Sequence, residues 1–311
     1  MDKRAPVGVV TVTFNSASVI SGFMDSLLKQ THAEFILYIV DNASSDGTLK
    51  LVSEYDDSGI VVIRSRTNVG VAEGNNIGIR AALRDGCGSV LLINNDTVFD
   101  SDLVSKLVDG LRQYQCDMIV PKILYFNQPE RIWCAGGYFS RIRAASGHFG
   151  EGRKDDGQFD QPRAVDYSPT CCMLVRRKVF DGIGLMDANY FVYFDDTDFC
   201  YRAYRAGIRL FYDPSARLFH KVGGLTGGAE SEFTLRYSTR NHTYYLLKNF
   251  SGWQVLVSLP AFQICIFAKY VFWERRLKSF WVAEKAFWEG ISLFCSRVGK
   301  TGGLGEPTEV P

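Results

Sequence analysis

Short runs of β-branched and aliphatic residues alternate with amphipathic segments through the N-terminal part of the chain. The runs predict strands at Val7–Thr13, Phe35–Asp41, Ile60–Arg64 and Ser89–Asn94, and the amphipathic segments predict helices at Val19–Lys29, Thr48–Tyr55 and Ala72–Arg84. Strands that alternate with helices form mostly parallel sheets with right-handed crossovers. The pattern therefore predicts an α/β fold, a mostly parallel sheet flanked by helices.

Polar residues gather where three of these strands end. The groups are Thr13-Phe14-Asn15, Asp41 through Gly47, and Asn94-Asn95-Asp96. Ligands of such sheets bind beyond the carboxyl ends of the strands. Each group alone is also ordinary turn or helix-cap sequence. Three of them at successive strand ends indicate a ligand pocket.

The first two groups suit a nucleotide. Asp41 can accept a hydrogen bond from a base N–H or a ribose hydroxyl, while Asn15 and the backbone of Thr13 line the base. Asp46 can hold the ribose or cap a helix, and capping fits it better. The loop from Asn68 to Gly78 is rich in Gly and Asn, so it either approaches a ligand closely or serves packing at a helix start.

The third group suits a divalent cation. A diphosphate and water supply most ligands of Mg²⁺ or Mn²⁺, so the single carboxylate of Asp96 can suffice. His220 would be a second ligand and favours manganese, although a histidine beside a lysine is more often a surface residue. We predict Mn²⁺ or Mg²⁺ at Asp96 and His220, with Asn95 beside the donor.

Three carboxylates, Asp195, Asp196 and Asp198, directly follow an aromatic run. Like charges next to apolar rings are unfavourable unless a cation or a titratable role offsets them. On a helix, Asp198 can pair with Arg202 one turn later. Asp195 and Asp196 are then left at the helix start facing a cleft, where one can act as a general base. The plainer interpretation is an acidic first turn that caps a helix.

Composition narrows the function classes. The 311 residues are 46% hydrophobic, which is ample for a core, and the net charge of +1 argues against a nucleic-acid partner. The eight cysteines show no CxxC spacing and are expected to be reduced cytosolic thiols in the core, and no signal peptide is expected at the start. Residues 141–165 are polar and Gly-rich, which indicates a surface loop or lid, or an insert without a role.

The C-terminal quarter is strongly apolar. As a helix, Trp253–Trp273 would be about 31 Å long, enough to match a hydrocarbon core. Pro260 interrupts it, and a single span would leave the cations of Arg275–Lys278 on the outer side. Phe280–Phe294 has one aromatic face. We predict two amphipathic helices lying in the membrane interface; the alternative is packing on the domain or on a second subunit of a homodimer.

The motifs together resemble the inverting family 2 glycosyltransferases, specifically the rhamnosyltransferase-like branch that builds bacterial surface polysaccharides. They lie between residues 7 and 225 and read TFN, VDNASSDGT, NVGVAEGNNIGI, LLINNDT, FVYFDDTDFCYRAYRAG and DPSARLFH. The resemblance implies a GT-A fold, a Rossmann-like sheet with a C-terminal helical extension. Together with the apolar C-terminal pattern, it predicts a catalytic domain of residues 1–235, split near residue 120 into nucleotide-binding and acceptor halves, and a membrane-associating region of residues 236–311.

The resemblance also implies roles for single residues. Asp41 resembles the base-binding carboxylate, Asp96 the last acidic position of the metal motif, and His220 the late metal ligand. Asp196 resembles the catalytic base, with Asp195 in place of a more usual Glu. The donor-binding residues implied are Thr13, Asn15, Asp41, Asn68, Asn95 and Asp96.

The implied reaction moves rhamnose from dTDP-rhamnose to a polyprenyl-linked saccharide at the cytoplasmic face of the bacterial inner membrane. Another hexosyl or a galactofuranosyl transferase of the same family is an alternative. A nucleotidyltransferase would need a Gly-rich, Arg-containing loop after the first strand, where this chain has Phe14-Asn15-Ser16. A non-catalytic sugar-nucleotide-binding scaffold is disfavoured because all three carboxylates between Asp195 and Asp198 are present.

Overall fold

The computed structural model of the chain describes residues 5–32, 34–55, 59–140, 145–222 and 231–301. The chain forms two compact units, one of residues 1–140 and 145–225 and the other of residues 141–144 and 226–311. Residue 235, where the sequence predicts the end of the catalytic domain, lies in helix α7 (Glu232–Asn249).

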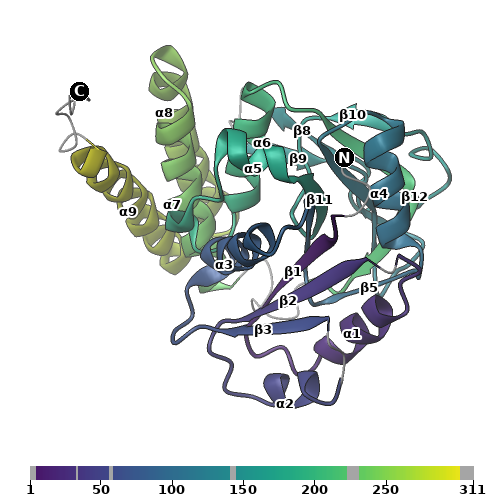
Figure 1. Ribbon diagram of the computed structural model, residues 1–311. Helices are drawn as coiled ribbons and strands as arrows, with labels where there is room; N and C mark the ends of the chain where they lie inside the picture. The colour runs from purple at the N-terminus through teal and green to yellow at the C-terminus, as the bar shows by residue number, and fades with distance from the viewer. Residues whose placement is uncertain (1–4, 33, 56–58, 141–144, 223–230, 302–311) are drawn as a thin grey trace, which may run out of the picture. The chain divides into compact units, whose positions relative to one another are not determined.

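One half of the sheet in the first unit is parallel (Figure 1). Its strands are β1 (Val7–Thr13), β2 (Phe35–Asp41), β3 (Ile60–Arg64) and β4 (Ser89–Ile93). They lie in the order β4-β1-β2-β3, and β1 to β3 have the predicted bounds. The register sets Thr13 opposite Asp41. The first two polar groups therefore lie side by side at one sheet edge.

The other half of the sheet is mixed. Its strands are β5 (Thr97–Phe99), β6 (Met118–Tyr125), β7 (Ile132–Cys134), β10 (Arg163–Val165), β11 (Cys172–Arg176) and β12 (Leu210–His220). Strand β11 runs antiparallel to both β4 and β6, whereas β12 runs parallel to β6. Strands β10 and β5 both pair with β12. Because β5 is antiparallel to β12, the end of β12 returns to the residues that follow β4.

Helices cover both faces of the sheet (Figure 1). They are α1 (Ile20–Leu28), α2 (Thr48–Val52), α3 (Gly70–Arg84), α4 (Leu103–Gln113), α5 (Arg177–Ile183) and α6 (Asp195–Arg205), with a short 3₁₀ turn at Ala188–Tyr190. Val9 belongs to the core formed with α1 and α4, and its neighbour Val10 belongs to the core formed with α3 and α6. Successive side chains of a strand point to opposite faces, so β1 contributes to both cores.

Glycines allow α3 to lie close to β1. A Cβ at Gly74 would lie 2.8 Å from the side chain of Val12, and one at Gly78 would lie 2.3 Å from that of Val10. Contacts this short would force the helix away from the sheet. For these two glycines the packing interpretation of the Gly-rich segment holds.

The polar segment expected as a loop or lid contains ordered strands. Ala145–His148 form β9, which pairs with β8 (Gly137–Ser140), and β10 joins the main sheet; residues 141–144 lie outside the described residues. The buried Lys122 binds the carboxylates of Asp155 and Asp160. The polar composition of the segment did not predict these strands, because it does not show that two of the carboxylates pair with a buried lysine on β6. All eight cysteines of the chain are free and six are buried.

The second unit consists of helices in its described part. They are α7, α8 (Trp253–Phe267), the π-helical η2 (Ala268–Trp273) and α9 (Leu277–Thr301). At Gly290 a Cβ on α9 would lie 2.4 Å from the carbonyl oxygen of Arg240, so only a small residue permits this approach to α7. Ala283 and Phe287, from the predicted amphipathic face of α9, are buried among these helices. That part of the face therefore packs inside the unit.

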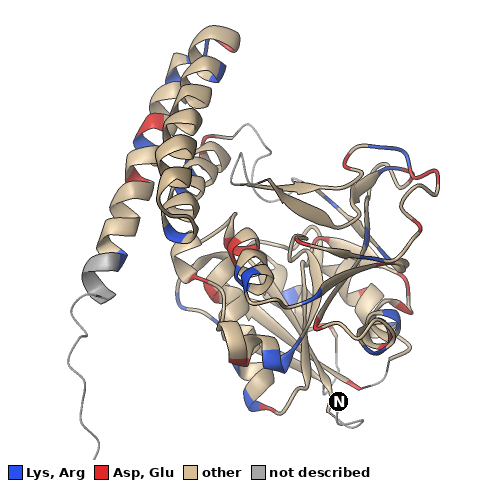
Figure 2. Cartoon of the chain, turned by 90° about the horizontal axis from the view of Figure 1, so that it is seen from above, with Lys and Arg blue, Asp and Glu red and all other residues tan. Residues whose placement is uncertain are grey.

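Helix α8 and η2 keep most of their apolar surface exposed. Leu256 is 75% exposed and Trp273 is 79% exposed. The helix Trp253–Trp273 has a mean hydropathy of 1.8, and 11% of that window is buried. Lys269 is the single charged residue between Trp253 and Trp273, whereas the helical region of Figure 2 also carries blue and red residues. By length and composition alone, this helix could cross a membrane.

Candidate active site

The ends of β1 and β2 are joined by hydrogen bonds around Asp41. Its buried carboxylate accepts from the hydroxyl of Thr13 at 2.9 Å and from the N–H of Ser44 at 3.1 Å. Asn15 has a positive φ of 51°, and its side-chain oxygen accepts from the N–H of Ser45 at 2.8 Å. Asp46 accepts from the N–H of Thr48 at 3.0 Å, as expected of a cap. Thr13, Asn15 and Asp41 thus form one polar surface.

The Gly-rich loop is tied to the segment that precedes the carboxylates. Asn68 accepts through its side-chain oxygen from the N–H of Gly70 at 2.9 Å. Gly70 has a φ of +84°, and a Cβ there would lie 2.4 Å from the carbonyl oxygen of Phe191. The same oxygen accepts from the N–H of Val71 at 2.5 Å. The loop that contains Asn68, a candidate donor residue, is therefore linked by backbone contacts to the segment that precedes the carboxylates of α6.

Asp96 and His220 come together at the end of β12. The Oδ1 of Asp96 lies 3.2 Å from the Nε2 of His220, and both side chains are mostly buried. Neither this oxygen, nor the Nδ1 of His220, nor the Oδ1 of Asn95 has a hydrogen-bond partner in the described part of the chain. The amide of Asn95 donates to the carbonyl of Val12 on β1. Buried polar atoms without partners are unfavourable unless a ligand satisfies them.

Helix α6 begins at Asp195 after a strained turn. Phe191, Tyr193 and Phe194 have φ values of 65°, 62° and 65°, and each such residue costs about 1–3 kcal/mol. Asp198 accepts from Arg202 at 2.9 Å, as the spacing predicted. Asp195 is buried, and its Oδ2 has no hydrogen-bond partner among the described residues. The strained turn thus places the carboxylates of the first helical turn in a buried setting.

Burial raises the pKa of both catalytic candidates. The pKa of Asp195 is raised to about 8 by burial and then by the charge of Asp196. Burial also raises the pKa of Asp196, while the N–H of Thr197, the hydroxyl of Tyr167 and the nearby His148 lower it. Because Asp196 accepts hydrogen bonds from Thr197 and Tyr167 while the Oδ2 of Asp195 has no partner among the described residues, the geometry favours the proton of the pair on Asp195 over Asp196.

Carboxylates of both candidate centres influence the same buried thiol, that of Cys171, electrostatically. Burial raises the pKa of Cys171 well above its ordinary value, and the carboxylates of Asp96 and Asp196 raise it further. The carbonyl of Cys171 also accepts from the N–H of Asn94 at 2.9 Å, next to the metal candidates. Strand β11, which starts at the next residue, therefore brings Asp96 and Asp196 to one region.

Aromatic residues that the sequence interpretation did not select complete the site. The hydroxyl of Tyr167 donates to Asp196 at 3.1 Å. The ring of His148 stacks on that of Tyr167 with centroids 5.8 Å apart. Trp133 packs edge-on against His148 and His220, with centroids 5.1 Å and 4.5 Å apart. No local pattern marks these residues, because their proximity comes from strand pairing far along the chain.

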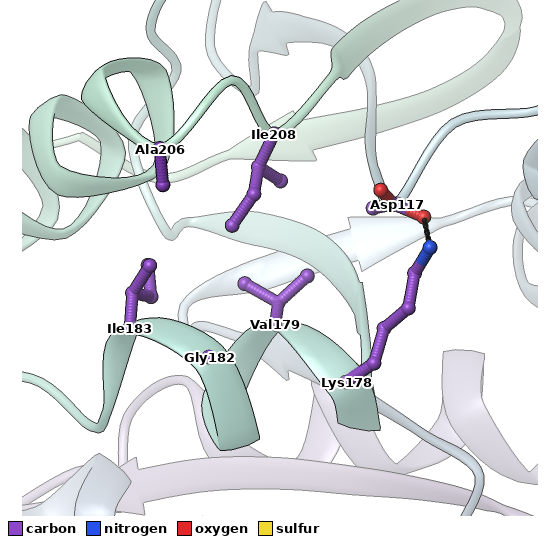
Figure 3. Close-up of a pocket in the computed structure, with 7 residues that line it drawn as sticks. All are labelled: Asp117, Lys178, Val179, Gly182, Ile183, Ala206 and Ile208. Carbon is purple, nitrogen blue, oxygen red and sulfur yellow. Dashed lines mark ion pairs between the residues drawn. The ribbon is translucent and has the colours of Figure 1, made fainter.

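A surface pocket of about 290 Å³ lies elsewhere in the first unit (Figure 3). It is lined by Asp117, Lys178, Val179, Gly182, Ile183, Ala206 and Ile208. The Nζ of Lys178 lies 2.6 Å from the Oδ1 of Asp117 at its edge. The pocket adjoins the first residues of β6 and β12, whereas the candidate site lies at their carboxyl ends.

The sequence profile of glycosyl transferase family 2 matches residues 8–184, more than half of the chain. The chain belongs to glycosyltransferase family 2. The matched region holds every predicted donor residue from Thr13 to Asp96 but ends before the carboxylates of α6. The match confirms the family inferred from the sequence motifs.

Named relatives of this family 2 chain include rhamnosyltransferases. It is 24% identical to an N-acetylglucosaminyl-diphospho-decaprenol L-rhamnosyltransferase of Mycobacterium tuberculosis, over 79% of this chain and 85% of the relative. It is 21% identical to the dTDP-rhamnosyl transferase RfbF of Shigella flexneri, over 77% and 79%. It is 30% identical to the low-salt glycan biosynthesis hexosyltransferase Agl10 of Haloferax volcanii, over 57% of this chain and 55% of that relative. The chain thus spans about half of the Haloferax protein.

Solved structures of GT-A glycosyltransferases share the fold. S. aureus TarS 1–349 in complex with UDP-GlcNAc has a TM-score of 0.57 at 17% identity, covering 94% of this chain and 82% of that one. Mannosyltransferase PcManGT from Pyrobaculum calidifontis, in complex with GDP-Man and Mn²⁺, has a TM-score of 0.56 at 15% identity, covering 98% and 89%. The predicted GT-A fold is confirmed, with a mixed sheet.

The raised pKa of Asp195 predicts a pH-dependent effect on stability. A carboxyl whose folded pKa of about 8 exceeds its ordinary 3.8 loses its contribution to stability as pH rises between these values. We therefore expect Asp195→Asn to become more stable relative to the parent as pH rises from about 4 to about 8, measured by urea unfolding. The exposed Asp109→Asn is the control and should show no trend. A difference between Asp195→Asn and parent that is constant with pH would contradict the assignment.

Proposed function

We propose that this family 2 enzyme is an inverting, metal-dependent rhamnosyltransferase. Its donor is a nucleoside-diphosphate sugar, dTDP-rhamnose, and its acceptor is a hydroxyl of a polyprenyl-linked saccharide in surface-polysaccharide assembly. The observation that carries the proposal is a series of side-chain contacts that joins the carboxylate pair to the metal candidates, running from Asp196 through Tyr167, His148 and Trp133 to His220 and Asp96. The names of the Mycobacterium and Shigella relatives support the sugar and the lipid-linked acceptor. The Haloferax hexosyltransferase supports another hexose as the alternative.

The residues at the end of β12 fit a divalent metal. The Oδ1 of Asp96 lacks a hydrogen-bond partner within the described residues and lies beside the Nε2 of His220, an oxygen and a nitrogen that suit Mn²⁺ or Mg²⁺. The described residues hold no group of three or more His, Cys, Asp or Glu side chains able to bind a metal. Two protein ligands agree with a cation held largely by diphosphate oxygens. When bound, the metal supplies positive charge that stabilises the leaving diphosphate.

Asp196 is the general base of the proposed reaction. Its carboxylate takes the proton of the acceptor hydroxyl while that oxygen forms a bond to the anomeric carbon. The bond from this carbon to the diphosphate oxygen breaks with its electron pair on the diphosphate. Attack from the opposite face inverts the configuration. Asp195, protonated at neutral pH, lies beside the base without adding a second charge.

Removing the base should abolish most transfer. Asp196→Asn keeps the size of the side chain but cannot take a proton, and loss of a general base typically costs about 10² to 10⁴-fold in rate. Nucleotide affinity should stay near that of the parent because the nucleotide residues lie at β1 and β2. Diphosphate release from a panel of nucleotide sugars, with and without acceptor extracts, measures this. Near-normal turnover by folded Asp196→Asn would move the role to Asp195.

Titration of Mn²⁺ against activity should distinguish the contributions of the two proposed metal ligands, Asp96 and His220. We expect Asp96→Ala to lose more activity than His220→Ala, because a carboxylate contributes charge as well as a ligand. His220→Ala should need more Mn²⁺ for half-maximal rate. Asp109→Ala, which removes an exposed carboxylate of α4, is the control. Unchanged metal dependence in both site variants would place the metal elsewhere.

The second unit is proposed to hold the enzyme peripherally at the cytoplasmic face of the membrane. The exposed apolar side chains of α8 and η2 support this, as does the basic segment Arg275–Lys278 that follows them. Apolar burial would supply most of the affinity, and each cation near an anionic surface adds about 1 kcal/mol. The polyprenyl acceptor would then be within the same interface.

Substitution on α8 tests the membrane contact without removing α9, which packs on α7. We expect the parent to sediment with anionic liposomes and the Leu256→Gln, Val257→Gln, Ile264→Gln triple variant to stay largely in the supernatant. The matched control is the double variant Val61→Gln, Val62→Gln on β3, which also replaces exposed aliphatic residues. A parent that remains in the supernatant at low salt as a discrete dimer would show that this surface is a subunit interface.

A further inference from the structure

Asp196 is held by donors on both of its oxygens. The Oδ1 accepts from the N–H of Thr197 at 2.6 Å, and the Oδ2 accepts from the hydroxyl of Tyr167 at 3.1 Å. Only the second donor comes from outside α6. We propose that Tyr167 is a positioning residue that fixes the Asp196 carboxylate for proton transfer, an inference that rests on the proposed role of Asp196 as the base.

The β8–β9 hairpin holds Tyr167 in place. Gly137 on β8 accepts from the N–H of Tyr167 at 3.3 Å, and a Cβ at Gly137 would lie 2.8 Å from the Tyr167 ring. A side chain at position 137 would therefore push the ring out of position. On β9, the ring of His148 stacks on the ring of Tyr167. The hydroxyl of Ser146, also on β9, lies 3.2 Å from the hydroxyl of Thr197. The hairpin thus supports both donors of Asp196.

Tyr167 is suited to donate at any working pH. Its side chain is buried, and burial raises the pKa of its phenol well above the ordinary value, with Asp196 raising it further. The hydroxyl therefore keeps its proton and points it at the carboxylate. Each Asp196 oxygen has a second lone pair, so the carboxylate can still accept from an acceptor hydroxyl while its rotation is restrained.

Other titratable groups also face Asp196. On its own helix are Asp195 and Asp198, on β9 is His148, and the buried thiols around it are Cys134, Cys171 and Cys200. Glu151 lies 3.9 Å from the Nδ1 of His148. Burial raises the pKa of all three thiols, so they stay neutral and add no charge near neutral pH. Within this set Tyr167 makes the direct side-chain hydrogen bond from another element.

Tyr167→Phe should slow transfer and shift its pH dependence. A hydrogen bond to a charged group is lost, so we expect kcat to fall about 10- to 100-fold with KM for the donor little changed. The acidic limb of the pH profile should move to higher pH, because the ionised form of Asp196 loses a donor. Tyr38→Phe is the matched control: its buried hydroxyl also donates to a carboxylate, that of Asp85, at 2.9 Å. It should leave kcat and the limb unchanged.

A second readout does not require transfer activity. In protein with ¹³C-labelled Asp carboxyl groups, the resonance that Asp196→Asn removes should titrate at higher pH in Tyr167→Phe and at the parent's pH in Tyr38→Phe. If Tyr167→Phe fails to fold, 3-fluorotyrosine placed at position 167, a stronger donor of similar size, should move the titration and the limb to lower pH. The proposal would be overturned if both the Asp196 titration and the acidic limb of the pH profile stayed at the parent's values in the substituted proteins. A parent with no transfer to any acceptor would refute the proposed function, and the titration would still decide the role of Tyr167.

Discussion

The pair of adjacent carboxylates at the start of α6, with Asp195 buried and Asp196 half-buried, is the constraint on which the candidate site depends. Removing charge from water is strongly unfavourable, so the fold must either keep Asp195 protonated or hydrogen-bond Asp196 in its charged form. It does both: burial raises the pKa of Asp195, and Asp196 accepts from Thr197 and Tyr167. The N-terminus of α6 adds its favourable dipole. In the proposed reaction this difference suits Asp196 to act as the base, with Asp195 as its protonated neighbour.

The turn that places these carboxylates has a strained backbone, and contacts with other elements of the first unit hold it in that conformation. The left-handed residues before α6 persist because their backbone is tied to other elements, chiefly through the Phe191 carbonyl and the start of α3. Gly70 makes this contact sterically allowed. Helix α3 begins at Gly70, two residues after Asn68, a proposed donor residue. One backbone junction therefore joins the loop around Asn68 to the segment before α6, so a change in one is expected to affect the other.

The second unit shows how one sequence pattern can serve two purposes. Part of the apolar face of α9 is buried by packing within the unit, and Gly290 allows α9 to approach α7 closely. On α8, polar Gln263 binds Glu284 of α9, so a residue that weakens the hydropathy of the segment joins two helices. The remaining surface around Leu256 and Trp273 is apolar and exposed. This surface, more than the amphipathic face of α9, is available for a membrane.

The sequence by itself determined the parallel strands, their polar ends and the pairing of Asp198 with Arg202, because these features depend on local periodicity and helical spacing. It also indicated the family through motifs kept in order along the chain. It did not reveal Tyr167 or His148, since both lie in or beside a polar segment whose composition indicates a loop. Their places follow from the paired strands β8 and β9, since Gly137 of β8 bridges to Tyr167 and β9 carries His148, and from partners such as Lys122 that satisfy the charges of that segment. Only long-range packing brings these groups together, and with them the hydrogen bonds and burial that make two adjacent aspartates differ.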